Sequence, residues 1–107
     1  MEERRKYKRY EHFFIMKIKS DSFDKEFIAI GINIGLGGIL FHSLINLDAG
    51  SEVIISIIIN KNQYIVKKGK VVRIESGNKN IKTNENIYAI ELENPLKENE
   101  LYEILNS

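Results

Sequence analysis

Two groups of residues in this chain have the types and spacing to bind an anionic, hydrogen-bonding ligand. The first is a basic segment near the N-terminus, where Arg4, Arg5, Lys6, Lys8 and Arg9 place five cations in six positions. Arg5 and Arg9 are four residues apart, so one helical turn would aim both side chains in the same direction. A guanidinium holds phosphate oxygens in a bidentate manner and stacks on a guanine face. The simpler interpretation of such a charge run is a solvated basic tail.

The second group is the glycine-rich stretch at residues 33–38, with the sequence Asn-Ile-Gly-Leu-Gly-Gly. Glycine permits positive φ and leaves backbone amides uncovered, so a ligand can approach the main chain closely. Asn33 adds a donor and an acceptor at the edge of that surface. A plain bend between two strands is the alternative interpretation. A nucleotide P-loop is disfavoured, because the stretch leads into strand-forming residues and offers no helix N-terminus to a phosphate.

The order and spacing of the two groups resemble the PilZ domain family. Arg5-x-x-x-Arg9 is similar to the RxxxR motif of these domains, and Asn33-x-Gly35-x-x-Gly38 is similar to their [D/N]xSxxG motif. The resemblance covers nearly the whole chain and implies a receptor for the bacterial second messenger cyclic di-GMP. One position departs from the family pattern, because Gly35 stands where the family usually has serine.

The resemblance also implies a role for each residue. Arg5 and Arg9 would grip phosphate and guanine, Asn33 would hydrogen-bond a guanine edge, and the Gly35–Gly38 backbone would let the base lie close. Arg4 adds charge that would favour a second nucleotide. The basic arm would close over the ligand and alter a surface that a downstream protein reads.

The missing serine leaves a second function open, a PilZ-type module that binds protein and no nucleotide. Loss of one neutral hydrogen bond costs about 0.5–1.5 kcal/mol, which is too little to abolish binding while both arginines and Asn33 remain. We therefore favour the cyclic di-GMP receptor. On the same grounds we expect Gly35→Ser to strengthen binding by on the order of 1 kcal/mol.

Other classes of function find less support. The sequence has no cysteine and no arrangement typical of a Ser-His-Asp triad or a carboxylate pair, so we expect no enzyme activity. His12 and His42 are isolated, so we expect surface or strand-edge positions, no metal site and no cofactor. The net charge is only +1 and no aromatic platform is evident, which argues against DNA or RNA as the partner.

Composition predicts one soluble domain over residues 1–107. Nineteen isoleucines favour a mainly β fold. The absence of cysteine fits a reducing cytoplasm, and no apolar stretch approaches membrane-spanning length, so we expect no signal peptide and no membrane insertion.

We expect a small antiparallel six-stranded β-barrel with a C-terminal α-helix, barrel closure being implied by the PilZ resemblance. Residues 1–11 would form the basic arm, mobile until an anion arrives, with Tyr7 and Tyr10 packed against the barrel. Residues 12–93 would form the barrel and 94–107 the helix. The strands are predicted at residues 13–19, 25–33, 38–43, 53–59, 64–74 and 87–92.

Finer features follow from the periodicity. Phe14, Met16 and Ile18 should point inward from the first strand, and Tyr88, Ile90 and Leu92 from the last. The apolar strand at 53–59 should be covered on both faces. Slipped alternation near residues 67–69 suggests a bulge. Asn94 should cap the helix, with Pro95 at its first position. Apolar residues at helical spacing should then face the barrel: Leu101, Ile104 and Leu105.

Overall fold

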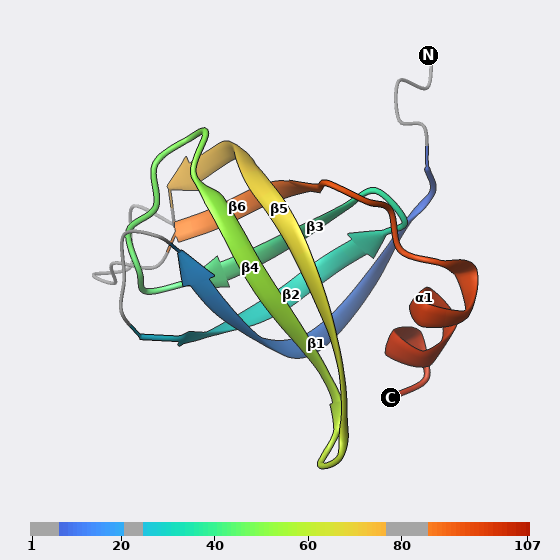
Figure 1. The fold of residues 1–107 in the computed structure, drawn as a ribbon. Coiled ribbons are helices and arrows are strands. Elements are labelled where there is room, and N and C mark those ends of the chain that lie inside the picture. The colour runs from blue at the N-terminus through green and yellow to red at the C-terminus, as the bar shows by residue number, and fades with distance from the viewer. Residues whose placement is uncertain (1–6, 21–24, 77–85) are drawn as a thin grey trace.

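The computed structural model describes residues 7–20, 25–76 and 86–107. Within these ranges the chain forms six strands and one helix (Figure 1): β1 (Arg9–Ser20), β2 (Phe27–Gly35), β3 (Gly38–Ser43), β4 (Glu52–Asn60), β5 (Gln63–Ser76), β6 (Asn86–Leu92) and α1 (Glu98–Leu105). All strand pairs are antiparallel, and the barrel closes in the order β1-β2-β3-β6-β5-β4. The predicted fold class is confirmed.

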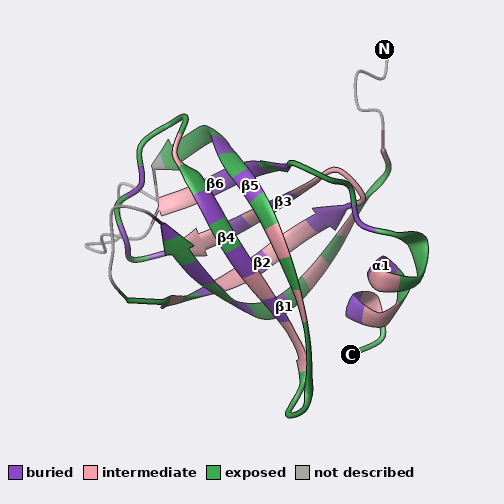
Figure 2. Ribbon diagram, viewed as in Figure 1, coloured by how far each residue is buried: buried purple, intermediate pink, exposed green. Residues whose placement is uncertain are grey.

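Alternating side chains build the core, because successive residues of a strand point to opposite faces. Phe14, Met16 and Ile18 of β1 are 5%, 0% and 0% exposed, as predicted. The same alternation runs along β3 and most of β4, whereas β2 and β6 each contain consecutive buried residues (Figure 2). From β6, Tyr88, Ile90 and Leu92 point inward. The core is a single cluster that fills the barrel and extends to the connection after β3 and to α1.

Tyr88 ties the connection after β3 to this core. Its hydroxyl donates to the Ile45 carbonyl oxygen (2.6 Å) and accepts from the Leu47 backbone N–H (3.0 Å). Its ring lies 5.4 Å from that of Phe41, centroid to centroid. The buried hydroxyl is thus satisfied by two backbone groups, which fixes the path of the chain from β3 towards β4.

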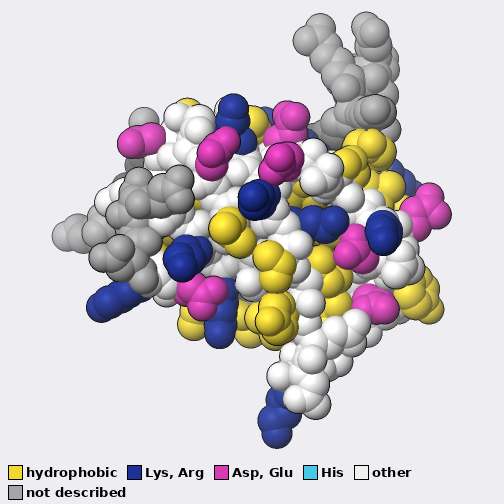
Figure 3. Space-filling view, in the orientation of Figure 1, with side chains coloured by type: hydrophobic (Ala, Val, Ile, Leu, Met, Phe, Trp, Pro, Cys, Tyr) yellow, Lys and Arg dark blue, Asp and Glu magenta, His cyan; other side chains and the backbone are white. Residues whose placement is uncertain are grey.

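The outer face of β4 is more open than the sequence predicts. Ile54 is 42% exposed, and two further apolar side chains on the adjoining strands, Ile15 of β1 and Val66 of β5, are 53% and 51% exposed. Figure 3 shows hydrophobic side chains gathered over these strands among lysine and carboxylate side chains. The prediction that both faces of this strand are covered is wrong, because α1 packs near only part of β4.

The helix begins three residues later than predicted, at Glu98, with Lys97 as its N-cap residue. The reason is tertiary: the Leu96 backbone N–H donates to the Leu36 carbonyl oxygen (2.7 Å), which holds Leu96 outside the helix. Glu100 Oε1 accepts from the Lys97 backbone N–H (2.8 Å) and lies 3.4 Å from Lys67 Nζ. The buried Leu101 and Ile104 then seal this end of the barrel.

Irregular pairing occurs at other places than the predicted one. Residues 67–69 pair regularly with β4, so the predicted bulge is wrong there. Lys67 is half-buried, and its Nζ lies 3.4 Å from the Pro95 carbonyl oxygen. The irregularity in β5 lies between Val71 and Arg73 instead, opposite β6.

Candidate functional site

The start of β1 lies beside the glycine-rich bend that joins β2 to β3. Arg9 pairs with Gly35, and Glu11 pairs with Asn33, in one antiparallel ladder. Figure 1 shows the start of β1, the bend and α1 gathered at the same end of the barrel. Arg9 and Tyr10 therefore belong to the sheet, which corrects the prediction of a detached arm through residue 11. The ladder brings the second arginine of one motif against the glycines of the other.

Arg9 is exposed, at the first position of β1. Arg4 and Arg5, the other predicted cationic ligands, lie outside the described residues. Lys8 adds a further charge, with its Nζ 5.3 Å from the centre of the Tyr10 ring. Tyr10 packs against the core as a partly buried side chain, as expected. Within the described part of the chain, the cationic side of the site is thus made of Arg9 and Lys8.

The bend needs glycine for close approach and not for backbone conformation. Among the described residues only Gly50 has positive φ, so Gly35 and Gly38 adopt φ values open to any residue. A methyl group at Gly35 would lie 2.7 Å from the Lys8 carbonyl oxygen, and one at Gly38 would lie 2.7 Å from the Ile90 carbonyl oxygen. Gly38 therefore allows β3 to approach β6. Gly35 allows the start of β1 to approach the bend.

This geometry reverses the expectation for Gly35→Ser. The space that a serine side chain needs is taken by the backbone of Lys8, which cannot turn away as a flexible side chain can. Serine would therefore push the start of β1 away from the bend before its hydroxyl could meet a ligand. Glycine in place of the family's serine at position 35 is thus what allows the start of β1 to lie this close to the bend.

Tyr7 covers the next glycine of the bend. A methyl group at Gly37 would lie 2.7 and 2.9 Å from Cδ2 and Cε2 of the Tyr7 ring, and all three nearest atoms belong to that ring. The tyrosine is partly buried by this contact. Sequence reasoning placed Tyr7 against the barrel but gave it no specific neighbour, because the contact joins segments thirty residues apart.

Asn33 lies at a depression of about 540 Å³ that is lined by residues of β1, β2 and β3: Glu11, His12, Phe13, Ile32, Asn33 and Leu40. Its Oδ1 is screened from solvent and has no hydrogen-bond partner among the described residues. A buried acceptor without a donor costs about 1–3 kcal/mol, so this oxygen is suited to accept from a ligand.

His12 was missed by sequence reasoning, which placed it at the surface or a strand edge. It is partly buried, and its Nε2 lacks a hydrogen-bond partner within the described ranges. His12 alternates in phase with the inward-facing Phe14 and Met16, and an irregularity in β1 between Glu11 and Phe14 places two residues opposite one on β2. No pattern in the sequence signals that irregularity.

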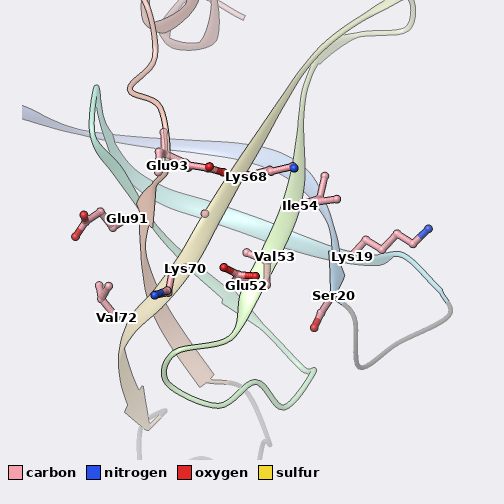
Figure 4. A pocket seen from close by; sticks show the side chains of 12 residues that line it. Lys19, Ser20, Glu52, Val53, Ile54, Lys68, Lys70, Val72, Glu91 and Glu93 are labelled. Atoms are coloured by element: carbon pink, nitrogen blue, oxygen red, sulfur yellow. The ribbon is translucent and has the colours of Figure 1, made fainter.

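A larger hollow of about 770 Å³ opens over β4, β5 and β6 (Figure 4). Three lysines and three glutamates line it among other residues: Lys19, Lys68, Lys70, Glu52, Glu91 and Glu93. None of the predicted site residues lines this hollow. Its three carboxylates balance its three ammonium groups, so it offers a phosphate no net positive charge, and the phosphate-binding candidate remains the arginine end of β1.

The back of the bend is fixed to the C-terminal part of the chain. The Gly37 carbonyl oxygen accepts from the Leu92 backbone N–H (2.9 Å), and the Leu36 carbonyl oxygen accepts from the Leu96 N–H. The bend therefore touches the arm on one side and the segment leading to α1 on the other. Over the described ranges, no group of three His, Cys, Asp or Glu side chains could hold a metal ion, and no helix could cross a membrane.

Comparisons with known proteins agree with this architecture. A family model for the PilZ domain matches residues 3–106. A search of curated proteins finds no match. Among solved structures, the PilZ domain of YcgR from Escherichia coli with c-di-GMP is similar at TM-score 0.74 and 13% identity, over 97% of this chain and 90% of that one.

Two further solved structures share the fold. The Bacillus subtilis inhibitor of motility (MotI/DgrA) matches at TM-score 0.71 and 17% identity, over 97% of this chain and 49% of that one, so this chain spans about half its length. The PilZ domain of CeSA from a cellulose-synthesizing bacterium matches at TM-score 0.56 and 11% identity, over 92% of each chain. At these identities the likeness shows the fold alone.

Proposed function

Because this chain belongs to the PilZ domain family, a family of cyclic di-GMP receptors, we propose that it binds cyclic di-GMP and acts as a receptor without catalytic activity. The observation that carries the proposal is the pairing of Arg9 with Gly35, which joins the two motifs at one end of the barrel. The structure of a PilZ domain with c-di-GMP in a similar fold supports the same ligand class.

In the proposed complex each residue has a distinct task. Arg9, with Arg5 and Arg4 from the preceding segment, binds phosphate through charge-assisted hydrogen bonds and stacks on guanine. Asn33 accepts from a guanine N–H through its unpartnered Oδ1. The backbone of Gly35 and Gly38 lets the base lie close to the bend. The change at the arm is then read by a downstream protein.

Calorimetric titration with cyclic di-GMP tests the proposal, with GTP and short oligonucleotides as ligand controls. We expect Arg9→Ala to weaken binding by about 1.5–3 kcal/mol, roughly tenfold to more than a hundredfold, because one charge-assisted contact is lost. Lys17→Ala is the matched control, since Lys17 is an exposed cation of the same strand that pairs with Ile28, away from the bend. If Arg9→Ala bound cyclic di-GMP as tightly as the parent protein, the proposed role of Arg9 in binding the ligand would be wrong.

A second candidate function has its own support. The Lys8 backbone fills the serine space at Gly35, and Tyr7 covers Gly37, so much of the bend surface is already occupied. That arrangement favours a PilZ-type module that binds protein and no nucleotide. The same titration separates the two functions: the parent protein binds cyclic di-GMP in the first case and shows no heat of binding in the second.

A further inference from the structure

Tyr7 stands midway between the two arginines of the RxxxR motif. Its ring lies against Gly37, in a contact that leaves no room for even a methyl group on that residue. The Lys8 carbonyl oxygen lies just as close to Gly35, and Arg9 pairs with Gly35 in the sheet. The segment from Tyr7 to Arg9 is therefore held at both of its ends.

The surface under the Tyr7 ring is itself fixed. The Gly37 carbonyl oxygen accepts from Leu92 of β6 at 2.9 Å, and the Leu36 carbonyl oxygen accepts from Leu96 at 2.7 Å. The ring thus rests on a piece of backbone that is anchored in the barrel and in the segment before α1. A contact of this kind restrains the arm before any ligand arrives.

Restraint of the arm has a direct effect on affinity. Like charges at positions 4, 5, 6, 8 and 9 repel one another, and ordering each residue of such a segment on binding costs conformational entropy. A segment that is already placed avoids part of that cost.

We propose that Tyr7 is a positioning residue, which anchors the arginine motif on Gly37 so that cyclic di-GMP meets a preformed cationic edge. This inference rests on the proposed function and adds a role that the two motifs do not contain. It also replaces the expectation that the whole basic segment is mobile without ligand. The contact with Gly37 is made by ring carbons, so a phenylalanine at this position keeps it.

The test combines Tyr7→Ala, Tyr7→Phe, Gly37→Ala and the double variant Tyr7→Ala/Gly37→Ala. Gly37→Ala introduces no backbone strain, since Gly37 has no positive φ, and the first atoms its methyl group would meet belong to the Tyr7 ring. Tyr102→Ala is the control, because Tyr102 is 68% exposed on α1. Titration with cyclic di-GMP gives the affinities. Amide exchange over residues 8–11 without ligand reports the anchor directly.

We expect Tyr7→Ala and Gly37→Ala each to weaken binding by about tenfold and to speed exchange over residues 8–11. The double variant should be no weaker than either single one, because both remove the same contact. Tyr7→Phe and Tyr102→Ala should bind within about twofold of the parent, since one keeps the ring and the other lies elsewhere.

Unchanged binding of Tyr7→Ala would overturn the inference, because the ring would then have no effect on affinity. Tighter binding would also overturn it, because the ring would then obstruct the ligand site. Additive losses in the double variant would also overturn it. If the parent protein does not bind cyclic di-GMP, the proposed function fails, and the exchange data alone decide the anchor. Faster exchange in Tyr7→Ala then supports the anchor, and unchanged exchange rejects it.

Discussion

At the scale of single residues, Gly35 decides how closely the arm approaches the bend. Serine or alanine at this position would meet the Lys8 carbonyl oxygen 2.7 Å from its Cβ, so the start of β1 must shift. We expect Gly35→Ser and Gly35→Ala both to weaken cyclic di-GMP binding. Both should also lower the free energy of unfolding by about 1–3 kcal/mol, and with it the melting temperature. Stronger binding of Gly35→Ser with weaker binding of Gly35→Ala would show that the hydroxyl contact outweighs the steric cost.

The residues of the site differ in how far the sequence reveals them. The grouping of Arg9, Asn33 and Gly35 could be predicted because their spacing resembles the family motifs, and the ladder between β1 and β2 places them near one another. Tyr7 against Gly37 could not, because an aromatic residue in a basic run carries no sign of its distant neighbour. The partial burial of His12 could have been predicted, because His12 alternates in phase with Phe14 and Met16.

At the scale of elements, the position of α1 depends on Glu100. The hydrogen bond from the Lys97 backbone N–H, and then the nearby Lys67 ammonium, hold the pKa of Glu100 below its ordinary value of 4.5, although partial burial opposes them. A carboxyl group whose pKa is lower in the folded state stabilises the fold above its unfolded pKa. That contribution is lost as the pH falls through the lowered value.

We therefore expect the stabilising contribution of Glu100 to be lost below pH 4.5, as the pH falls through the lowered pKa of this carboxyl group. Glu100→Gln should cost about 1 kcal/mol or less at pH 7, because the side chain is 23% exposed and the pair with Lys67 is partly screened. The cost should vanish at low pH. Chemical unfolding of both proteins between pH 3 and 7 checks this, and an equal difference across the range would exclude Glu100 as the cause.

The elements themselves were predicted with unequal success. Strands with clear alternation, such as those with Phe14, Met16 and Ile18, follow from local pattern because burial selects every second side chain. The start of α1 does not, since a hydrogen bond from Leu96 to Leu36 overrides the local preference for a cap at Asn94. The first residues of β1 were also missed, because the inward positions there are held by Tyr10 and His12 and not by aliphatic side chains.

At the scale of the whole molecule, a ligand that binds only the folded barrel must stabilise it. At a free cyclic di-GMP concentration of 100 times Kd, the gain is about 2.7 kcal/mol. For a domain of this size that corresponds to a rise of roughly 10–20 °C in Tm. Thermal unfolding with increasing cyclic di-GMP checks the expectation. A similar rise with GTP would point to general anion binding, and no rise with either would favour the protein-binding module.

The two hydrogen bonds behind the bend have a consequence for communication in both directions. Leu36 and Gly37 present one side to the arm, and their carbonyl groups hold Leu96 and Leu92 on the other. If nucleotide binding shifts this backbone, the affinity of any protein that grips α1 changes by some factor. Thermodynamic reciprocity then requires that protein to change the nucleotide affinity by the same factor. In a cell rich in the downstream partner, the protein would therefore become occupied at a different cyclic di-GMP concentration than in a cell that lacks the partner.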